Sequence, residues 1–369
     1  MKVIFYPCYS SANPYQAELK HYLKKQGIEY IGIKKNDFHH IIQRSKKADL
    51  IHLHWVDPLV QKEGLASSVR SLSKATLVLL RLKMRGLKII WTFHNLHPHE
   101  NKFPLLNNIG NFIFAFFSHK IIIHNKSGLQ IATKRLKVSS EKFIVLKHPH
   151  YASVFGRCKT SALSRDLKRA LDSNAFTFLF MGMIRPYKGL EDLFDAFFGA
   201  CVGPSRLLVV GKAHDKEYEK KIKGYCLRDE RITFINRHIR NEEVPQVFAR
   251  SHVGILPYRS VFSSGSLALM QSFKLPVILP QLDCFEEMLK DNSALFYNPE
   301  KISSLKDMLE HAYQNPDSIE KIGETLWRRN AKWTFKAFSH KHSEIFQSAV
   351  GVTEHHMNQG LSATPGLIL

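Results

Sequence analysis

Two cations stand close together in one short segment of the second half of the chain. In the segment Phe178–Leu193 an apolar run ends at Met181, Gly182 follows, and Arg185 and Lys188 come next. An arginine fork beside a mobile lysine charge suits a diphosphate group. Because the pair lies between a predicted strand and a predicted helix, we expect it at the sheet edge where open α/β folds bind ligands. A solvated basic loop is the alternative interpretation.

A second loop further along the chain offers hydroxyl and backbone N–H groups. Ser263, Ser264 and Ser266 surround Gly265, and a helical pattern follows at once. Free N–H groups and the dipole make a helix N-terminus favourable for anions. A serine that only caps the helix is the alternative. A third loop, Gly211–His214, also ends an apolar run, so we predict three loops that share one phosphate site.

Polar rings and amides follow three apolar runs in the first half of the chain. They indicate a polar cleft opposite the phosphate site, because the ends of parallel strands meet at one sheet edge. Zinc is the rival use of so many histidines, but their spacing matches no zinc pattern and there is no Asp-x-Asp pair, so we predict no metal. The residues concerned are His54, Trp55, His94, Asn95, His97, His99, Glu100, His124 and Ser127.

The loop after the first apolar run carries further polar side chains. Asn13, Tyr15 and Gln16 lie in it and are our candidates for recognising the hydroxyl groups of an acceptor. An ordinary Asn-Pro turn, with a helix that starts at Pro14, explains the same residues equally well.

The elements that must position these groups alternate between short apolar runs and longer helical patterns. Such alternation predicts buried parallel strands in βαβ units. Two series of runs predict an α/β fold with two doubly wound sheets that face each other. The predicted strands are Val3–Tyr6, Leu50–Leu53, Lys88–Phe93, Lys120–His124 and Phe143–Leu146 in the first half, and Phe176–Met181, Leu207–Val210, Ile232–Ile235, Val253–Leu256 and Val277–Leu279 in the second.

The polar stretch His148–Arg165 has no clear periodicity, and we place the domain boundary there. Residues 1–160 and residues 161–330 are predicted to form the two domains. A helix over residues 331–349 is expected to cross back to the first domain, and residues 350–369 read as a tail.

Charge and cysteine content narrow the partners and the compartment. The 369 residues include 53 lysines and arginines against 32 acidic residues, a net charge of +21, which favours an anionic partner. Neither zinc-finger spacing nor an RNP-like signature accompanies that charge, so we do not expect a nucleic-acid partner. The segment Leu65–Leu87 mixes cations with apolar residues. This pattern fits a helix that lies on anionic lipid, and it also fits a core helix whose basic side faces solvent. Five scattered cysteines indicate a reducing compartment.

The motif strand–Gly182–x–x–Arg185–x–x–Lys188–Gly, with the later small-residue loop and Leu-Pro-Val-Ile strand, resembles the donor half of GT-B glycosyltransferases. The closest likeness is to the large family that assembles bacterial polysaccharides and lipid-linked oligosaccharides. The resemblance implies two facing Rossmann-like domains, residues 1–160 binding the acceptor and residues 161–330 the nucleotide sugar. Arg185 and Lys188 would then contact the donor diphosphate. Where the family often has two glutamates, this chain has Ser263 and Gln271, so only Gln271 remains for the ribose.

The resemblance also implies a metal-independent hexosyltransferase without a cofactor. It would move a hexose from a GDP- or UDP-linked donor to a saccharide or lipid-linked acceptor, in the cytoplasm or at the inner face of the membrane. His94 would lie near the transferred sugar, His54 and Trp55 near the acceptor, and Glu100, then Asp57, are the candidate bases. A nucleotide-sugar epimerase of the same fold and a non-catalytic binder of sugar nucleotides or anionic surfaces are the alternatives.

Overall fold

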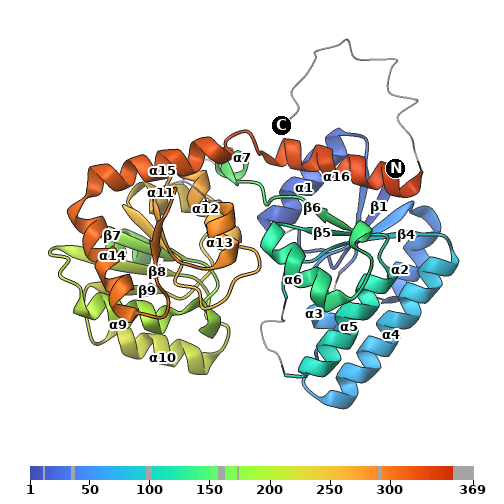
Figure 1. Cartoon of the computed structure of the whole chain (residues 1–369), viewed down its shortest axis with the longest axis horizontal. Helices are drawn as coiled ribbons and strands as arrows, with labels where there is room; N and C mark the ends of the chain where they lie inside the picture. Colours follow the sequence, from blue (N-terminus) through green and yellow to red (C-terminus); the bar gives the residue numbers. More distant parts are fainter. Residues whose placement is uncertain are drawn as a thin grey trace, which may run out of the picture.

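The computed structural model describes residues 1–10, 13–34, 38–96, 102–156, 163–172, 174–289 and 293–351. Two lobes lie side by side, each built around a parallel sheet of six strands with helices on both faces (Figure 1). The predicted α/β fold with two doubly wound parallel sheets is therefore confirmed.

The N-terminal sheet has the strand order β2-β1-β3-β4-β5-β6, so the order reverses at the β1/β3 pair. Its strands are β1 (Lys2–Tyr6), β2 (Glu29–Gly32), β3 (Leu50–Leu53), β4 (Lys88–Thr92), β5 (Lys120–Ile123) and β6 (Phe143–Val145). The helices of this lobe are α1 (Pro14–Lys25), α2 (Phe38–Arg44), α3 (Asp57–Val60), α4 (Leu65–Met84), α5 (Pro104–Phe117), α6 (Lys126–Leu136) and α7 (Ala152–Phe155).

The C-terminal sheet has the order β12-β11-β10-β7-β8-β9 and reverses at the β7/β10 pair. Its strands are β7 (Phe176–Met181), β8 (Ser205–Val210), β9 (Ile232–Ile235), β10 (Val253–Ile255), β11 (Val277–Pro280) and β12 (Leu295–Tyr297). Its helices are α8 (Arg165–Ala170), α9 (Leu190–Gly199), α10 (Lys216–Cys226), α11 (Val244–Ala249), α12 (Gly265–Ser272), α13 (Asp283–Met288), α14 (Ile302–Gln314) and α15 (Pro316–Asn330).

Two of the four edge strands, β2 and β12, escaped the sequence prediction. No residue of β2 is fully buried and β12 is only three residues long, so neither provides the longer buried apolar run that marks a central strand. The central strands show that run clearly, since all of Ile121–Ile123 is buried.

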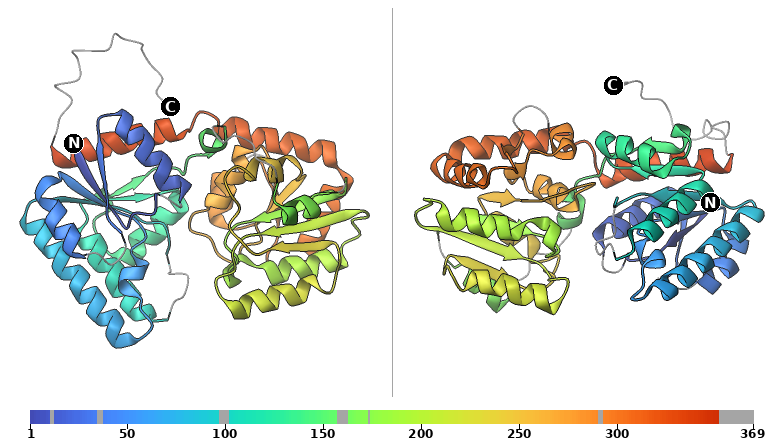
Figure 2. Two further views of the ribbon diagram at one scale, coloured as in Figure 1. Left: turned by 180° about the vertical axis from the view of Figure 1, so that it is seen from behind. Right: turned by 60° about the horizontal axis from the view of Figure 1, so that its bottom comes forward.

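The last helix, α16 (Phe335–Val350), leaves the C-terminal lobe and packs along α1 in the N-terminal lobe (Figures 1 and 2). Its buried side chains Phe338, His342 and Phe346 face the N-terminal sheet, where the Phe346 ring lies 5.3 Å from that of His52. None of the helices that the structure describes is long and apolar enough to cross a membrane.

Candidate active site

The carboxyl ends of the two sheets meet between the lobes. The Ser263 hydroxyl donates a hydrogen bond of 3.0 Å to the backbone carbonyl of His94, which follows β4. The Asn125 amide, which follows β5, donates to the carbonyl of Phe262. The loop between β10 and α12 therefore touches the loop ends of two N-terminal strands, so groups from both lobes can act on one ligand.

Two hollows lie where the lobes meet, and we call the one of about 710 Å³ the larger hollow, to distinguish it from the smaller one beside Lys188. The predicted residues Gly182, Gly265 and Ser266 line it, with Pro14 from the N-terminal lobe. A side chain at Gly182 would bring its Cβ to 2.8 Å from the Ser266 hydroxyl oxygen. Glycine at position 182 thus lets the loop after β7 approach the start of α12, on either side of the point where the strand order reverses.

The larger hollow has a wall that the sequence analysis missed. Residues 237–242, in the loop after β9, line it together with Lys212 after β8. Arg237 is held by Asp166, at 2.8 Å, and by Glu243 at 3.1 Å. The signal was present as a run of charged and amide residues directly after the predicted strand Ile232–Ile235, at the same sheet edge as the other loops.

Lys188 lines a smaller hollow of about 200 Å³, together with Asn95 from the other lobe. Its ammonium nitrogen lies 3.5 Å from the ring centroid of Tyr258. Burial lowers the pKa of Lys188 to about 8, because removal from water disfavours the charged form. Gly189 follows Lys188 directly. Its φ of 67° and its close approach to the Pro257 carbonyl leave no room for a side chain at that position.

Arg185 is half-buried, and its Nε atom is buried without a hydrogen-bond partner in the structure. Within the described ranges, neither Arg185 nor Lys188 forms an ion pair with a carboxylate. Two partly desolvated cations without a counter-charge are expensive to hold, and a bound anion removes that cost. Neither side chain lines the larger hollow.

The remaining residues predicted for the donor side have mixed surroundings. Ser264 caps α12 by accepting the N–H of Leu267 at 3.1 Å, which fits the capping interpretation of this serine. Gln271 is buried on α12 and lines neither hollow. Ser263 contributes its hydroxyl to the contact with His94 rather than to a ligand position.

On the opposite side, three predicted residues gather around His94. The His54 Nδ1 and His94 Nε2 atoms are 3.2 Å apart, and the Trp55 ring stacks on His94 with centroids 4.3 Å apart. The ring of Tyr15 meets that of His94 edge-on at 5.3 Å. His94 itself is 7% exposed.

Four further histidines extend this group, and only His124 was predicted at the cleft. We call the whole set the histidine cluster: His52, His54, His94, His124, His148 and His342. Burial, reinforced in most of them by neighbouring histidines, lowers their pKa values, to about 4 for His124 and about 3 for His148 and His342. The rings are therefore neutral near pH 7, and a neutral imidazole can accept a proton.

Two of the predicted acceptor residues help to shape the first loop. The Gln16 amide is fully buried, donates to the carbonyl of Pro7 at 3.0 Å and accepts the N–H of Tyr9. Asn13 caps α1 by accepting the N–H of Tyr15 at 2.9 Å. These contacts fit the Asn-Pro turn, and the assignment of both residues to acceptor recognition stays a prediction.

The candidate bases differ in what the structure says of them. Glu100, with His97 and His99, lies outside the described residues. Asp57 opens α3, and burial raises the pKa of its carboxyl to about 6, although a hydrogen bond with Asn95 lowers it in part. A carboxylate that titrates near neutrality suits a general base. Among the described residues no group of histidine, cysteine or carboxylate side chains could hold a metal ion.

Comparison with known proteins links the C-terminal lobe to a family. Residues 175–315 match the family model described as glycosyl transferases group 1. A GDP-mannose:glycolipid 4-beta-D-mannosyltransferase of Xanthomonas campestris pv. campestris is 26% identical over 232 residues, which are 63% of this chain and 61% of that protein. The protein of the same description from a named strain of that pathovar is 25% identical over 234 residues, again 61% of its length. The chain thus matches about 61% of the length of these curated relatives.

Solved structures extend the likeness to the whole fold. HepE of Anabaena, in complex with UDP and glucose, superposes with a TM-score of 0.72 at 14% identity, covering 94% of this chain and 100% of that one. Sucrose-phosphate synthase of Thermosynechococcus elongatus gives a TM-score of 0.71 at 12% identity, over 95% of this chain and 99% of that one. At such identities the superpositions establish the fold alone. Together with the family match over residues 175–315, they confirm the resemblance seen in the sequence: the chain has the GT-B fold, and its C-terminal lobe is similar to glycosyl transferases group 1.

Proposed function

We propose that this protein transfers a hexose from a nucleotide diphosphate sugar to a saccharide or lipid-linked saccharide acceptor. The observation that carries the proposal is the pair Arg185 and Lys188, two partly buried cations without a carboxylate partner in the described ranges. They lie in the region matched by the group 1 family model, across the lobes from His94.

On the donor side, Arg185 and Lys188 would neutralise the diphosphate and favour its departure. Gly182, Gly265 and Ser266 would let the phosphates approach the first N–H groups of α12, an eight-residue helix. The loop at residues 237–242 would enclose the remainder of the nucleotide, because it forms the opposite wall of the larger hollow. Gln271 stays a prediction for the ribose and requires the ligand to reach a buried amide.

On the acceptor side, a hydroxyl must lose its proton as it attacks the sugar carbon. His94 would lie beside the sugar, held by the ring of Trp55 and by its contact with His54. Asp57 is the base that we favour among the described carboxylates, because its pKa of about 6 leaves it ionised at neutral pH and still basic. Protonation of the carboxylate would then slow the reaction below that pH.

The curated relatives act on a glycolipid with GDP-mannose, so GDP-mannose and a lipid-linked saccharide are the first substrates to test. A UDP-linked sugar is the second choice, because the Anabaena structures contain UDP or UDP-glucose. No metal or cofactor enters the proposed reaction. We place the protein in the cytoplasm, where nucleotide sugars are used, and at the membrane when the acceptor is a lipid.

Thermal unfolding of the purified protein with GDP, UDP and their sugars tests the donor part of the proposal. We expect one nucleotide family to raise the unfolding temperature, and Arg185→Ala and Lys188→Ala to abolish that rise. Lys216→Ala, which alters an exposed cation on α10 of the same lobe, is the matched control and should keep it. Equal behaviour of all nucleotides, or an unchanged shift in both variants, would overturn the donor site.

A further inference from the structure

Two neighbouring helices of the N-terminal lobe, α4 and α5, expose apolar side chains to solvent. Neither helix contributes a residue to the lining of the larger hollow. On α5 these side chains recur at helical spacing on the face opposite the buried one. The exposed fractions are 74% for Leu105, 44% for Ile109, 43% for Phe112 and 51% for Phe116. No charged residue interrupts the helix, because Pro104–Phe117 contains none. A solvent-facing helix normally carries charges there, so this face is suited to contact with an apolar phase.

The adjacent helix α4 continues the apolar surface and gives it a basic rim. Its exposed apolar side chains are Leu65, Val69, Leu77, Leu80 and Met84. The spacing of Arg70, Lys74 and Arg81 places them on one face of α4, next to these apolar side chains. Neither α4 nor α5 contains an acidic residue. We call this combined surface, the outer faces of α4 and α5, the α4–α5 face.

Cations also occur where the two helices meet. The Lys83 ammonium nitrogen lies 5.1 Å from the ring centroid of Phe116, and that of Lys142 lies 5.9 Å from it. The rings of Phe112 and Phe116 are 6.2 Å apart on the exposed side of α5. Long cationic side chains beside exposed aromatic rings are the arrangement found at the boundary between lipid tails and headgroups.

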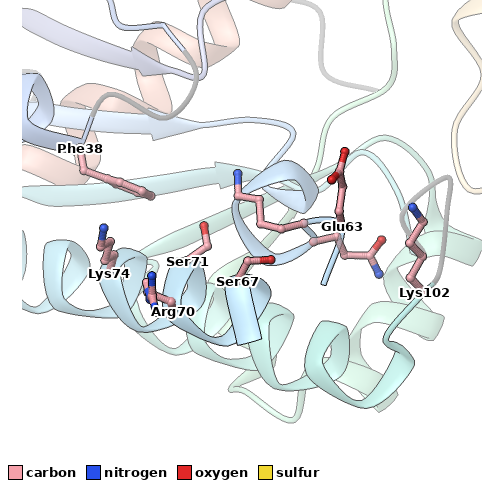
Figure 3. A pocket seen from close by; sticks show the side chains of 9 residues that line it. Phe38, Glu63, Ser67, Arg70, Ser71, Lys74 and Lys102 are labelled. Carbon is pink, nitrogen blue, oxygen red and sulfur yellow. The ribbon is translucent and has the colours of Figure 1, made fainter. Parts of the chain in front are cut away.

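A basic hollow adjoins the rim. Figure 3 shows Ser67, Arg70, Ser71 and Lys74 along one side of α4, with Phe38 above them and Glu63 and Lys102 toward the far end. The hollow measures about 810 Å³ and is also lined by Lys62. Among the described residues that line it, Glu63 is the one carboxylate. Arg70 and Lys74 form no ion pair with any residue that the structure describes. Cations and hydroxyls in one hollow fit a phosphate group.

We propose that the α4–α5 face docks on a bilayer that contains anionic lipid, with apolar side chains of α5 and α4 inserted among the acyl chains and the basic hollow against the lipid phosphates. A second copy of the chain fits this face poorly, because two surfaces with cations and no acidic residue repel each other. The net charge of +21 favours an anionic surface in the same way. The inference supports the proposed function, since a lipid-linked acceptor lies at such a surface, but docking requires no turnover.

The test is flotation of the full chain with phosphatidylcholine vesicles, with and without phosphatidylglycerol. We expect binding only to the anionic vesicles. The pair Arg70→Gln and Lys74→Gln should weaken it about tenfold or more, since each cation near a charged surface contributes roughly a fivefold factor. The pair Phe112→Glu and Phe116→Glu should weaken it by more than about tenfold, because buried aromatic area is lost and charge of the wrong sign is added.

Matched controls lie on the other lobe. Leu227→Glu alters an apolar side chain that is 89% exposed after α10, and Lys216→Gln with Lys220→Gln removes two exposed cations from that helix. These variants should float like the unmodified chain. Unfolding temperature and its shift with nucleotide, measured on every variant, report whether the fold and the donor site survive, so loss of docking is told apart from failure of the transferase proposal.

Three results would overturn the inference. The unmodified chain could fail to float with anionic vesicles, or the α4–α5 variants could float as well as the controls. The phenylalanine variants could instead abolish a concentration-dependent dimer while vesicles bind nothing, which would assign the face to a second copy of the chain.

Discussion

The two lobes share one strand arrangement but present opposite chemistry at the edges that meet. On the N-terminal side lies the histidine cluster, in which five of the six side chains are buried and all six pKa values are lowered, so this side is polar and neutral near pH 7. The C-terminal edge holds Arg185 and Lys188, which are charged and lack a carboxylate partner among the described residues. The difference teaches that the two edges suit different parts of a substrate: one stays uncharged near pH 7 and the other requires an anion. A diphosphate donor and a hydroxyl acceptor would complete both.

The largest effect on turnover is expected from removing one of the two cations of the C-terminal edge. Arg185→Ala or Lys188→Ala should lower turnover about 100- to 1000-fold, as loss of one group that stabilises developing charge does. Steady-state rates of nucleotide release measure the change, with Lys216→Ala as the control. Activity within about twofold of the unmodified enzyme would show that neither cation meets the leaving diphosphate.

The neutral side is tested by His94→Ala. We expect turnover to fall about 100-fold, within the range for a positioned proton-transfer or orienting group, while the nucleotide still raises the unfolding temperature. His311→Ala, at an exposed histidine on α14, should leave both readouts unchanged. If His94→Ala also removed the nucleotide shift, the two edges would not act on separate parts of the substrate.

The pH dependence of donor binding should carry the signature of Lys188. Its pKa of about 8 in the free enzyme means that it is charged below pH 8 and loses its proton above. A bound diphosphate favours the charged form, so affinity should be constant below pH 8 and fall up to about tenfold for each pH unit above it. Calorimetric titration measures the effect. Lys188→Arg keeps the charge throughout and should flatten the curve; an equal slope in that variant would contradict the assignment.

The histidine cluster predicts sensitivity to acid. Unfolded histidines titrate near pH 6.5, whereas burial keeps the pKa of His124 near 4 and that of His342 near 3. The unfolded chain therefore binds more protons below pH 6.5, and stability should fall as the pH drops from there toward 4, by about 1.4 kcal/mol per pH unit for each such group. Urea unfolding at a series of pH values measures the slope.

A matched pair of variants isolates this contribution. His342→Leu removes a buried histidine whose pKa is lowered and whose Nε2 atom has no hydrogen-bond partner. This variant should therefore reduce the loss of unfolding free energy per pH unit in acid. His311→Leu, on the exposed surface of α14, should not change it. Equal slopes in both variants would assign the acid sensitivity to other groups.

The smallest effect is expected at the contact between the edges. Ser263→Ala removes the hydrogen bond to the His94 carbonyl and should cost about 1 kcal/mol, the usual net value of a neutral hydrogen bond. We expect a modest rise in KM for the donor with little change in kcat. Ser260→Ala, at an exposed position in the same loop, is the control. A larger loss in kcat than in KM would give Ser263 a role in the reaction itself.

The sequence predicted ten of the twelve strands, including all eight central ones, and the fold class, because buried parallel strands leave continuous apolar runs. It also singled out Arg185 and Lys188, because a loop between strand and helix fixes where its residues lie. It could not predict that His342 of α16 lies beside His52, since that contact joins distant segments. Nor could it show that the Gln16 amide bonds to its own loop, because Asn13–Gln16 reads equally as a turn or as a polar site.

The central claim is transfer to an acceptor, and acceptor-dependent release of nucleotide tests it most directly. The full chain would be incubated with GDP-mannose or a UDP-hexose, with and without a lipid-linked saccharide, and both the nucleotide and the lengthened acceptor would be measured. The account predicts equal amounts of nucleotide and product, only when the acceptor is present, and neither product with Arg185→Ala. Release of nucleotide and free sugar without an acceptor, or tight binding of the donor without turnover, would contradict it.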